Sequence, residues 1–119
     1  MAKEKQHAGT TPLTIVAGEA ITKNRFVTYD GKHTVDISCV GVSLFDTDSG
    51  DYVSVQSLGR VPVEAAGAIS AGDFVGSDAA GKAQSLTVSD VANVLKICGK
   101  AAEAAAADGD LVLVDLKPL

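Results

Sequence analysis

The stretch Gly-Asp-Tyr-Val-Ser-Val-Gln at residues 50–56 is the part of the sequence that decides the fold class. After the turn-forming Gly-Asp pair, Val53 and Val55 alternate with more polar neighbours, which is the period of a half-buried β-strand. A similar stretch, Gly-Asp-Leu-Val-Leu-Val, occupies residues 109–114. We therefore expect the same turn and strand to occur twice.

A second pair of matching segments supports this duplication. Residues 20–27 read Ala-Ile-Thr-Lys-Asn-Arg-Phe-Val, and residues 68–75 read Ala-Ile-Ser-Ala-Gly-Asp-Phe-Val. Both lead to a Gly-Lys pair, at 31–32 and at 81–82. The segments follow the same order in each half, which favours two β units in one domain, because a single unit is too small to bury its own face. The alternative is that these matches are only common turn chemistry.

Short runs of Val, Ile, Thr and aromatic residues between turn residues predict the other strands. Strands are expected at residues 13–16, 26–29, 35–38, 40–45, 52–56, 60–64, 74–75, 94–97 and 111–116. Pro62 indicates an edge strand, because proline cannot donate to a ladder. Helix signals are weak: residues 89–93 fit one turn, and the alanine-rich residues 100–107 fit a loop with one or two helical turns.

These signals predict a mainly β fold, a small β-barrel or β-tulip-like domain built from two similar β units with a short helix or two. The units are expected at about residues 12–62 and 63–119, within a single domain at 12–119. Residues 1–11 have no apolar period and are expected to form an extended, flexible N-terminal arm. Aromatic residues are only 4% of the 119 residues, so the core is thin, and we expect an oligomer subunit.

Charge and hydropathy exclude several classes of protein. The formal net charge is −5, and the ten basic residues are scattered, so nucleic-acid binding is not expected. No window approaches the roughly 20 apolar residues of a membrane span. The polar start of the chain, residues 1–7, lacks the apolar core of a signal peptide, so we expect synthesis in a reducing cytoplasm.

Metal sites are not expected. The run Asp-Thr-Asp-Ser-Gly-Asp at 46–51 has the alternating oxygens that suit Ca²⁺. However, Gly50 comes one place early for an EF-hand, and Ser57 stands where the loop needs Glu. We interpret the run as a polar turn between strands. His7 and His33 have no other ligand at metal-binding spacing.

No enzyme motif is present either. Cys39 and Cys98 occupy near-equivalent places in the two halves, and we interpret them as small buried hydrophobic residues, with a disulfide as the alternative. Neither cysteine has a histidine and third group indicated beside it for nucleophilic catalysis. The chain lacks a Gly-x-Ser-x-Gly elbow and a phosphate-binding loop. We expect no catalytic activity and no cofactor.

The β units, read through residues 17–32, 40–55 and 59–75, resemble the head decoration (capsid cement) proteins of tailed bacteriophages. The resemblance covers the chain from about Pro12 onward. It implies a non-enzymatic structural virion protein that is a homotrimer in most relatives. Such proteins sit on the outer surface of the expanded head and cement neighbouring major capsid protein subunits against internal DNA pressure. Residues 68–75 are also similar to β-clip domains of the SAF type, so a small ligand- or carbohydrate-binding module is the alternative.

If the resemblance holds, the capsid-binding face is expected at the arm and the start of the first strand. The residues concerned are Gly9, Thr10, Thr11, Pro12 and Leu13. The arm could add a strand to an edge of the capsid protein, where backbone hydrogen bonds supply affinity. The alternative for this segment is a disordered tail.

Overall fold

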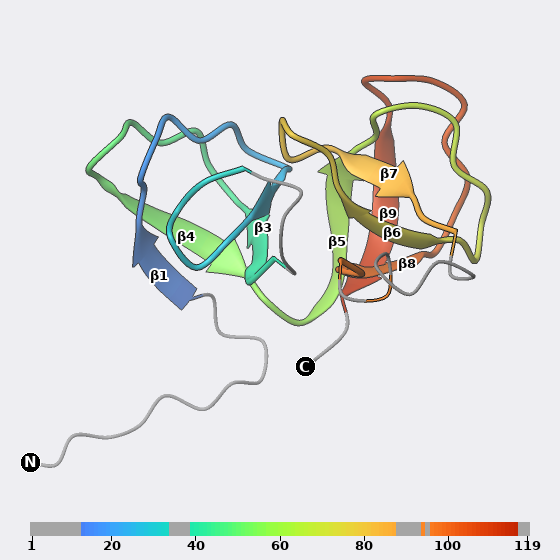
Figure 1. Ribbon diagram of the computed structural model, residues 1–119, viewed down its shortest axis with the longest axis horizontal. Coiled ribbons are helices and arrows are strands. Elements are labelled where there is room, and N and C mark those ends of the chain that lie inside the picture. Colours follow the sequence, from blue (N-terminus) through green and yellow to red (C-terminus); the bar gives the residue numbers. More distant parts are fainter. Residues whose placement is uncertain (1–12, 34–38, 88–93, 95, 117–119) are drawn as a thin grey trace, which may run out of the picture.

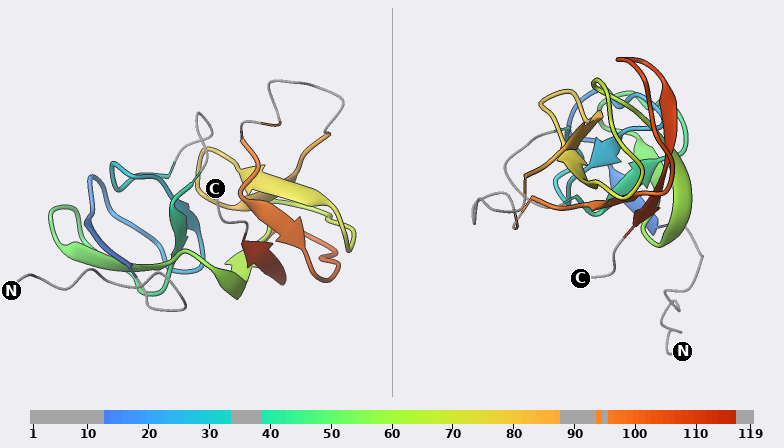
Figure 2. Two further views of the ribbon diagram at one scale, coloured as in Figure 1. Left: turned by 90° about the horizontal axis from the view of Figure 1, so that it is seen from below. Right: turned by 90° about the vertical axis from the view of Figure 1, so that its right-hand side faces the viewer.

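Two antiparallel sheets make up the computed structural model, which describes residues 13–33, 39–87, 94 and 96–116. The first sheet has the order β1-β4-β3-β2, with β1 Leu13–Val16, β2 Phe26–Val27, β3 Gly41–Ser43 and β4 Tyr52–Gln56. The second has the order β5-β9-β8-β6-β7, with β5 Gly59–Glu64, β6 Phe74–Ser77, β7 Ala83–Ser85, β8 Gly99–Ala101 and β9 Leu111–Leu116. The sheets lie side by side along the long axis (Figures 1 and 2).

The two sheets have the same strand topology. Strands β1, β2, β3 and β4 correspond in order and pairing to β5, β6, β8 and β9, and β7 is an addition at the edge. The isolated bridge between Ile21 and Thr47 has a counterpart between Ile69 and Ala105. The chain passes from one sheet to the other between Gln56 and Gly59. The matching segments of the sequence therefore occupy matching places in space.

The mainly β prediction is confirmed, and several strands fall where the alternation placed them. Strands β1, β4 and β9 have the predicted bounds. Pro62 lies in an edge strand, as predicted, because β5 pairs with β9 alone. An isolated parallel bridge between Ala65 and Ala83 brings the end of β5 to the start of β7, so the outer strands of this sheet meet at one point.

Other predicted elements are wrong. The strand expected at residues 94–97 does not form, since Val94 is helical and Lys96 lies in a turn, and β8 begins only at Gly99. The alanine-rich residues 100–107 contain no helical turn. Ala101 lies in β8 and is 3% exposed, so tertiary packing overrides its helix propensity. The strand expected at 35–38 and the helical turn expected at 89–93 lie outside the described residues.

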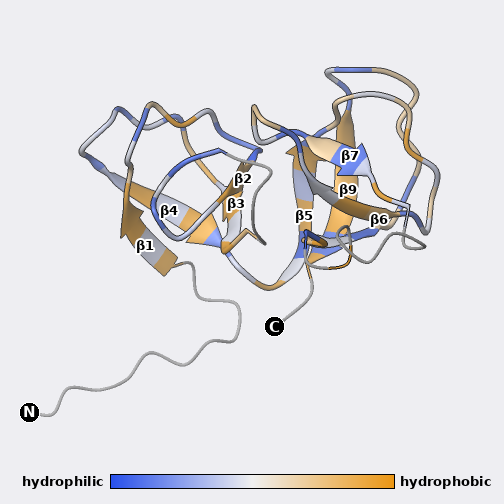
Figure 3. Cartoon of the chain, in the orientation of Figure 1, coloured by the Kyte–Doolittle hydropathy of each residue, from blue (hydrophilic) through white to orange (hydrophobic). Residues whose placement is uncertain are grey.

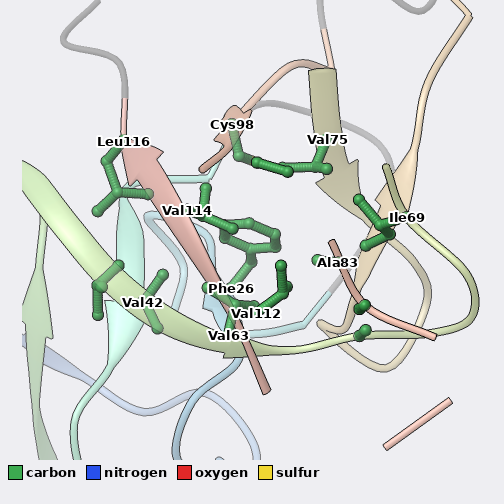
Figure 4. Close-up of a cluster of buried hydrophobic side chains, with 14 of the residues drawn as sticks. Phe26, Val42, Val63, Ile69, Val75, Ala83, Cys98, Val112, Val114 and Leu116 are labelled. Atoms are coloured by element: carbon green, nitrogen blue, oxygen red, sulfur yellow. The ribbon is translucent and has the colours of Figure 1, made fainter. Parts of the chain in front are cut away.

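Buried side chains form two clusters. One lies within the first sheet and contains Val27, Val53 and Val55. The other lies mainly in the second sheet but includes Phe26 of β2, which is 1% exposed and sits among Val63, Val112 and Val114 (Figure 4). Figure 3 shows hydrophobic residues gathered in the strands and hydrophilic ones in many connecting loops. The core is therefore continuous across the boundary between the two halves, because Phe26 of the first half packs among residues of the second.

Backbone hydrogen bonds also join the halves. The N–H of Phe26 donates to the Gly81 carbonyl at 2.7 Å, and the N–H of Glu64 donates to the Asn24 carbonyl at 2.8 Å. In the first half, these bonds involve Asn24 and Phe26, which lie on either side of Arg25 at the entry to β2. The two sheets are thus packed as one body through the β2 end of the first sheet.

Candidate docking surfaces

The outer edge of β1 is the first candidate surface. Among the described residues, β1 pairs only with β4, and the Ala17 N–H that follows it donates to Asp51 on the β4 side at 2.8 Å. Backbone groups alternate along an antiparallel strand, so those of Thr14 and Val16 point away from β4. The side chains of Thr14 and Val16 are exposed, whereas Leu13 and Ile15 pack against the core of the first sheet.

The turn at residues 28–32 covers one end of this edge. Gly31 has a φ of 77°, and a Cβ placed there would lie only 2.2 Å from the Val16 carbonyl oxygen. The Gly18 N–H donates to the Gly31 carbonyl at 2.9 Å and fixes this contact. Within the described part of the chain, the edge is left unpaired around Thr14, close to where residues 1–12 join β1.

Of the five residues predicted to bind the capsid, the structure describes one. Leu13 is the first residue of β1 and pairs with Val55 of β4. Gly9, Thr10, Thr11 and Pro12 lie outside the described residues. Leu13 therefore begins an edge strand, and the capsid-binding site itself stays a prediction.

The second candidate surface is an open groove in the first half, which sequence reasoning did not find. It has a volume of about 570 Å³ and lies between the loop at residues 20–22 and the segment from Phe45 to Ser54. Phe45 and Tyr52 line it and are 64% and 75% exposed. Asp46, Asp48 and Asp51 also line it. The groove thus combines two exposed rings with acidic side chains, and we call it the aromatic groove.

The second half has no such aromatic pair at the matching positions. The Leu44 N–H donates to Ser54, and the Ala102 N–H makes the equivalent bond to Leu113, so Phe45 corresponds to Glu103. The register of β1 with β4 and of β5 with β9 makes Tyr52 correspond to Leu111. The two halves share a topology but not these two aromatic side chains, so the aromatic groove is particular to the first half.

The acidic run in the groove forms turns rather than a cation cage. The Oδ1 of Asp46 accepts a hydrogen bond from the Lys23 N–H at 2.9 Å, and the Asp51 N–H donates to the Asp48 carbonyl at 3.1 Å. Within the described part of the chain, no three His, Cys, Asp or Glu side chains are placed to hold a metal ion.

The His33 ring makes structural contacts. Its Nε2 accepts from the Thr22 N–H at 3.3 Å, and its Nδ1 lies 2.7 Å from the Phe26 carbonyl. The ring also packs on Gly81, whose φ is 85°, and a Cβ there would lie 2.4 Å from Nδ1. His33 therefore helps to hold the loop before β2 against the second half.

Comparison with known proteins identifies the family. The family model for phage cement proteins matches residues 5–116. The chain belongs to the phage cement protein family. The head fiber gp8.5 N base of bacteriophage phi29 has a similar fold, with a TM-score of 0.72 and 22% sequence identity. The match covers 91% of this chain and 94% of that chain. A comparison with curated proteins finds no match.

The family assigns the cement protein a structural role in the phage capsid, as the sequence resemblance implied. This places it in the virion. Its family is one of structural phage proteins. In the described part of the chain, no helix is long and apolar enough to cross a membrane.

Proposed function

We propose that this cement protein binds the outer surface of the expanded phage head and holds neighbouring major capsid protein subunits together against internal DNA pressure. The observation that carries the proposal is that, among the described residues, no strand pairs with the outer edge of β1, which directly follows residues 1–12. An edge strand presents unpaired N–H and C=O groups, which another chain can extend by β-pairing. Gly9, Thr10, Thr11, Pro12 and Leu13 would form this contact.

The arm can reach a neighbouring subunit. Residues 1–12 span at most roughly 40 Å when extended. Side chains in this segment are small or polar, so most of the affinity would come from the backbone.

Removal of residues 2–11 tests this contact in a binding assay with purified expanded heads. We expect the truncated protein to keep its fold and to bind at least about tenfold more weakly. Equal affinity of the truncated and full-length proteins would contradict the proposed site.

A single substitution tests the edge of β1 without removing the arm. The Thr14 N–H points away from β4, so Thr14→Pro removes a donor from the open edge and leaves the β1–β4 ladder intact. Thr14→Ala keeps the donor and is the matched control. We expect weaker head binding for Thr14→Pro alone, with similar thermal unfolding of both variants.

We also propose that the protein is a homotrimer in which the aromatic groove contacts a second copy of this chain. Exposed Phe45 and Tyr52 supply apolar area that the thin core lacks, and the other half has Glu103 in place of Phe45.

Phe45→Glu should therefore dissociate the trimer, whereas Tyr29→Ala, at an exposed ring outside the groove, should not. Light scattering measures both masses, and an unchanged mass for Phe45→Glu would exclude the groove as the contact.

A further inference from the structure

Two free thiols, Cys39 and Cys98, lie together in the core where the halves meet. Cys39 lies shortly before β3, and Cys98 lies immediately before β8, the matching strand of the other sheet. The two residues are 8% and 5% exposed, and both belong to the cluster around Phe26. Figure 4 shows Cys98 in this cluster. Each half of the protein thus contributes one thiol to a shared site.

The two side chains are hydrogen-bonding neighbours within this buried cluster. The Cys39 thiol donates a hydrogen bond to the Cys98 sulfur. The Cys98 thiol itself donates to the Lys96 carbonyl oxygen at 3.7 Å, and its sulfur also accepts from the Cys39 and Ser77 backbone N–H groups. Because both residues lie in one buried cluster and hydrogen-bond to each other, the two sulfur atoms are neighbours in the core.

The environment of the pair makes the two thiols unequal. The hydrogen bond from Cys39, helped by the backbone N–H groups, lowers the pKa of the Cys98 thiol. The same hydrogen bond, together with burial, raises the pKa of the Cys39 thiol. Cys98 therefore ionises first, and the thiolate is the nucleophile in thiol oxidation. A metal is a poor alternative partner, because the described residues place no third ligand beside the pair.

We propose that Cys39 and Cys98 are a redox pair that closes to an intrachain disulfide when the protein meets a small oxidant such as hydrogen peroxide. The Cys98 thiolate attacks one peroxide oxygen, and the O–O bond breaks to give a sulfenic acid and hydroxide. The Cys39 sulfur then attacks the Cys98 sulfur, and the S–O oxygen leaves as water. Two thiols lose two electrons and two protons, and one peroxide becomes two waters.

Closure would lock the two halves to each other. The bond would join the start of β3 in one sheet to the start of β8 in the other, and it would close a long loop of chain. A cross-link over a long loop stabilises a protein mainly by restricting its unfolded state. The proposal concerns the chain itself and does not depend on the docking surfaces above.

Peroxide treatment of the full-length protein, followed by intact mass spectrometry and peptide mapping under non-reducing conditions, tests the proposal. We expect each chain to lose two hydrogens, to yield one cross-linked peptide pair, and to gain at least about 5 °C in Tm, reversed by dithiothreitol. Sulfinic or sulfonic acids without a cross-link would overturn the proposal. So would disulfides between chains, or thiols that stay reduced in the folded protein while an unfolded sample oxidises.

A matched variant separates the cross-link from general effects of the oxidant. The Cys98 N–H donates to the Val75 carbonyl, and the Val40 N–H makes the equivalent bond to Val27 in the first half. Val40 therefore occupies the position that matches Cys98, which shows that this backbone position accepts a valine. Cys98→Val should fold and should show no rise in Tm with peroxide. A rise equal to that of the native protein would exclude the disulfide as its cause.

Discussion

The guanidinium group of Arg25 lies 3.1 Å from the carboxylate of Glu64, and this ion pair joins the two halves of the protein. Both side chains are only about one-fifth exposed. Lys82 extends the network, since its Nζ lies 3.4 Å from Glu64 and 2.9 Å from Asp108. Because the pair is sheltered from solvent and connects separate sheets, it should be worth more than an exposed ion pair.

A double-mutant cycle with Arg25→Gln and Glu64→Gln measures that contribution. We expect a coupling free energy of about 1 kcal/mol from urea unfolding. The cycle Arg60→Gln and Asp115→Asn is the control, because that pair links neighbouring strands and is more than half exposed. Its coupling should be smaller, because solvent screens an exposed ion pair. Equal couplings would show that the Arg25 pair does not hold the halves together.

Phe26 should be the most costly side chain to truncate, because it fills the core at the boundary between the sheets. Phe26→Ala should lower the free energy of unfolding by about 3–5 kcal/mol. Phe26→Leu is a milder variant in case the alanine variant does not fold. Tyr29→Ala, at a ring that is 72% exposed, should change stability by less than about 0.5 kcal/mol. A small effect at Phe26 would contradict a shared core.

Gly31 and Gly50 form a matched pair for a test of the turn that covers β1. Both have a positive φ, 77° and 92°, so alanine is strained at either position. At Gly50 a Cβ meets nothing within 4 Å, whereas at Gly31 it meets the Val16 carbonyl at 2.2 Å. Gly31→Ala should therefore destabilise by at least about 2 kcal/mol more than Gly50→Ala in urea unfolding. Similar costs would mean that the turn does not pack on β1.

The exposed pair Arg60–Asp115 predicts a small, acid-sensitive contribution to stability. The hydrogen bond from Arg60 lowers the pKa of Asp115, and the nearby positive charge adds to this effect. A carboxyl group whose folded pKa is lowered stabilises the fold above its unfolded pKa and loses that effect as the pH falls. Native protein should thus exceed Arg60→Gln in Tm at neutral pH, and the difference should shrink below about pH 3.9. A difference in Tm that grows on acidification would contradict a lowered pKa of Asp115.

Strong alternation and turn residues made much of the fold predictable. Val53 and Val55 in β4, and the equivalent valines of β9, are buried because their strands pair in the middle of each sheet. By contrast, β7 was not expected, since Ala83, Gln84 and Ser85 have little strand propensity. Pairing with β6 holds them in place, and that partner is invisible to a local pattern.

The candidate surfaces were less predictable, for a physical reason. Leu13 was placed correctly at the start of a strand, but nothing local to it reveals that the other edge of that strand is open. The alternation at residues 52–56 places Tyr52 on the face opposite Val53 and Val55, but only the path of the loop shows that Phe45 and Tyr52 line one groove. Exposure of a ring depends on contacts that are distant along the chain.

The release of DNA from filled heads on heating tests the central claim most directly. Heads that lack the cement protein would be compared with the same heads after purified protein has been added back and shown to bind. The account predicts that decoration raises the temperature of DNA release, and that protein without residues 2–11 raises it less at equal concentration. An unchanged release temperature for fully decorated heads would contradict the proposed cementing function.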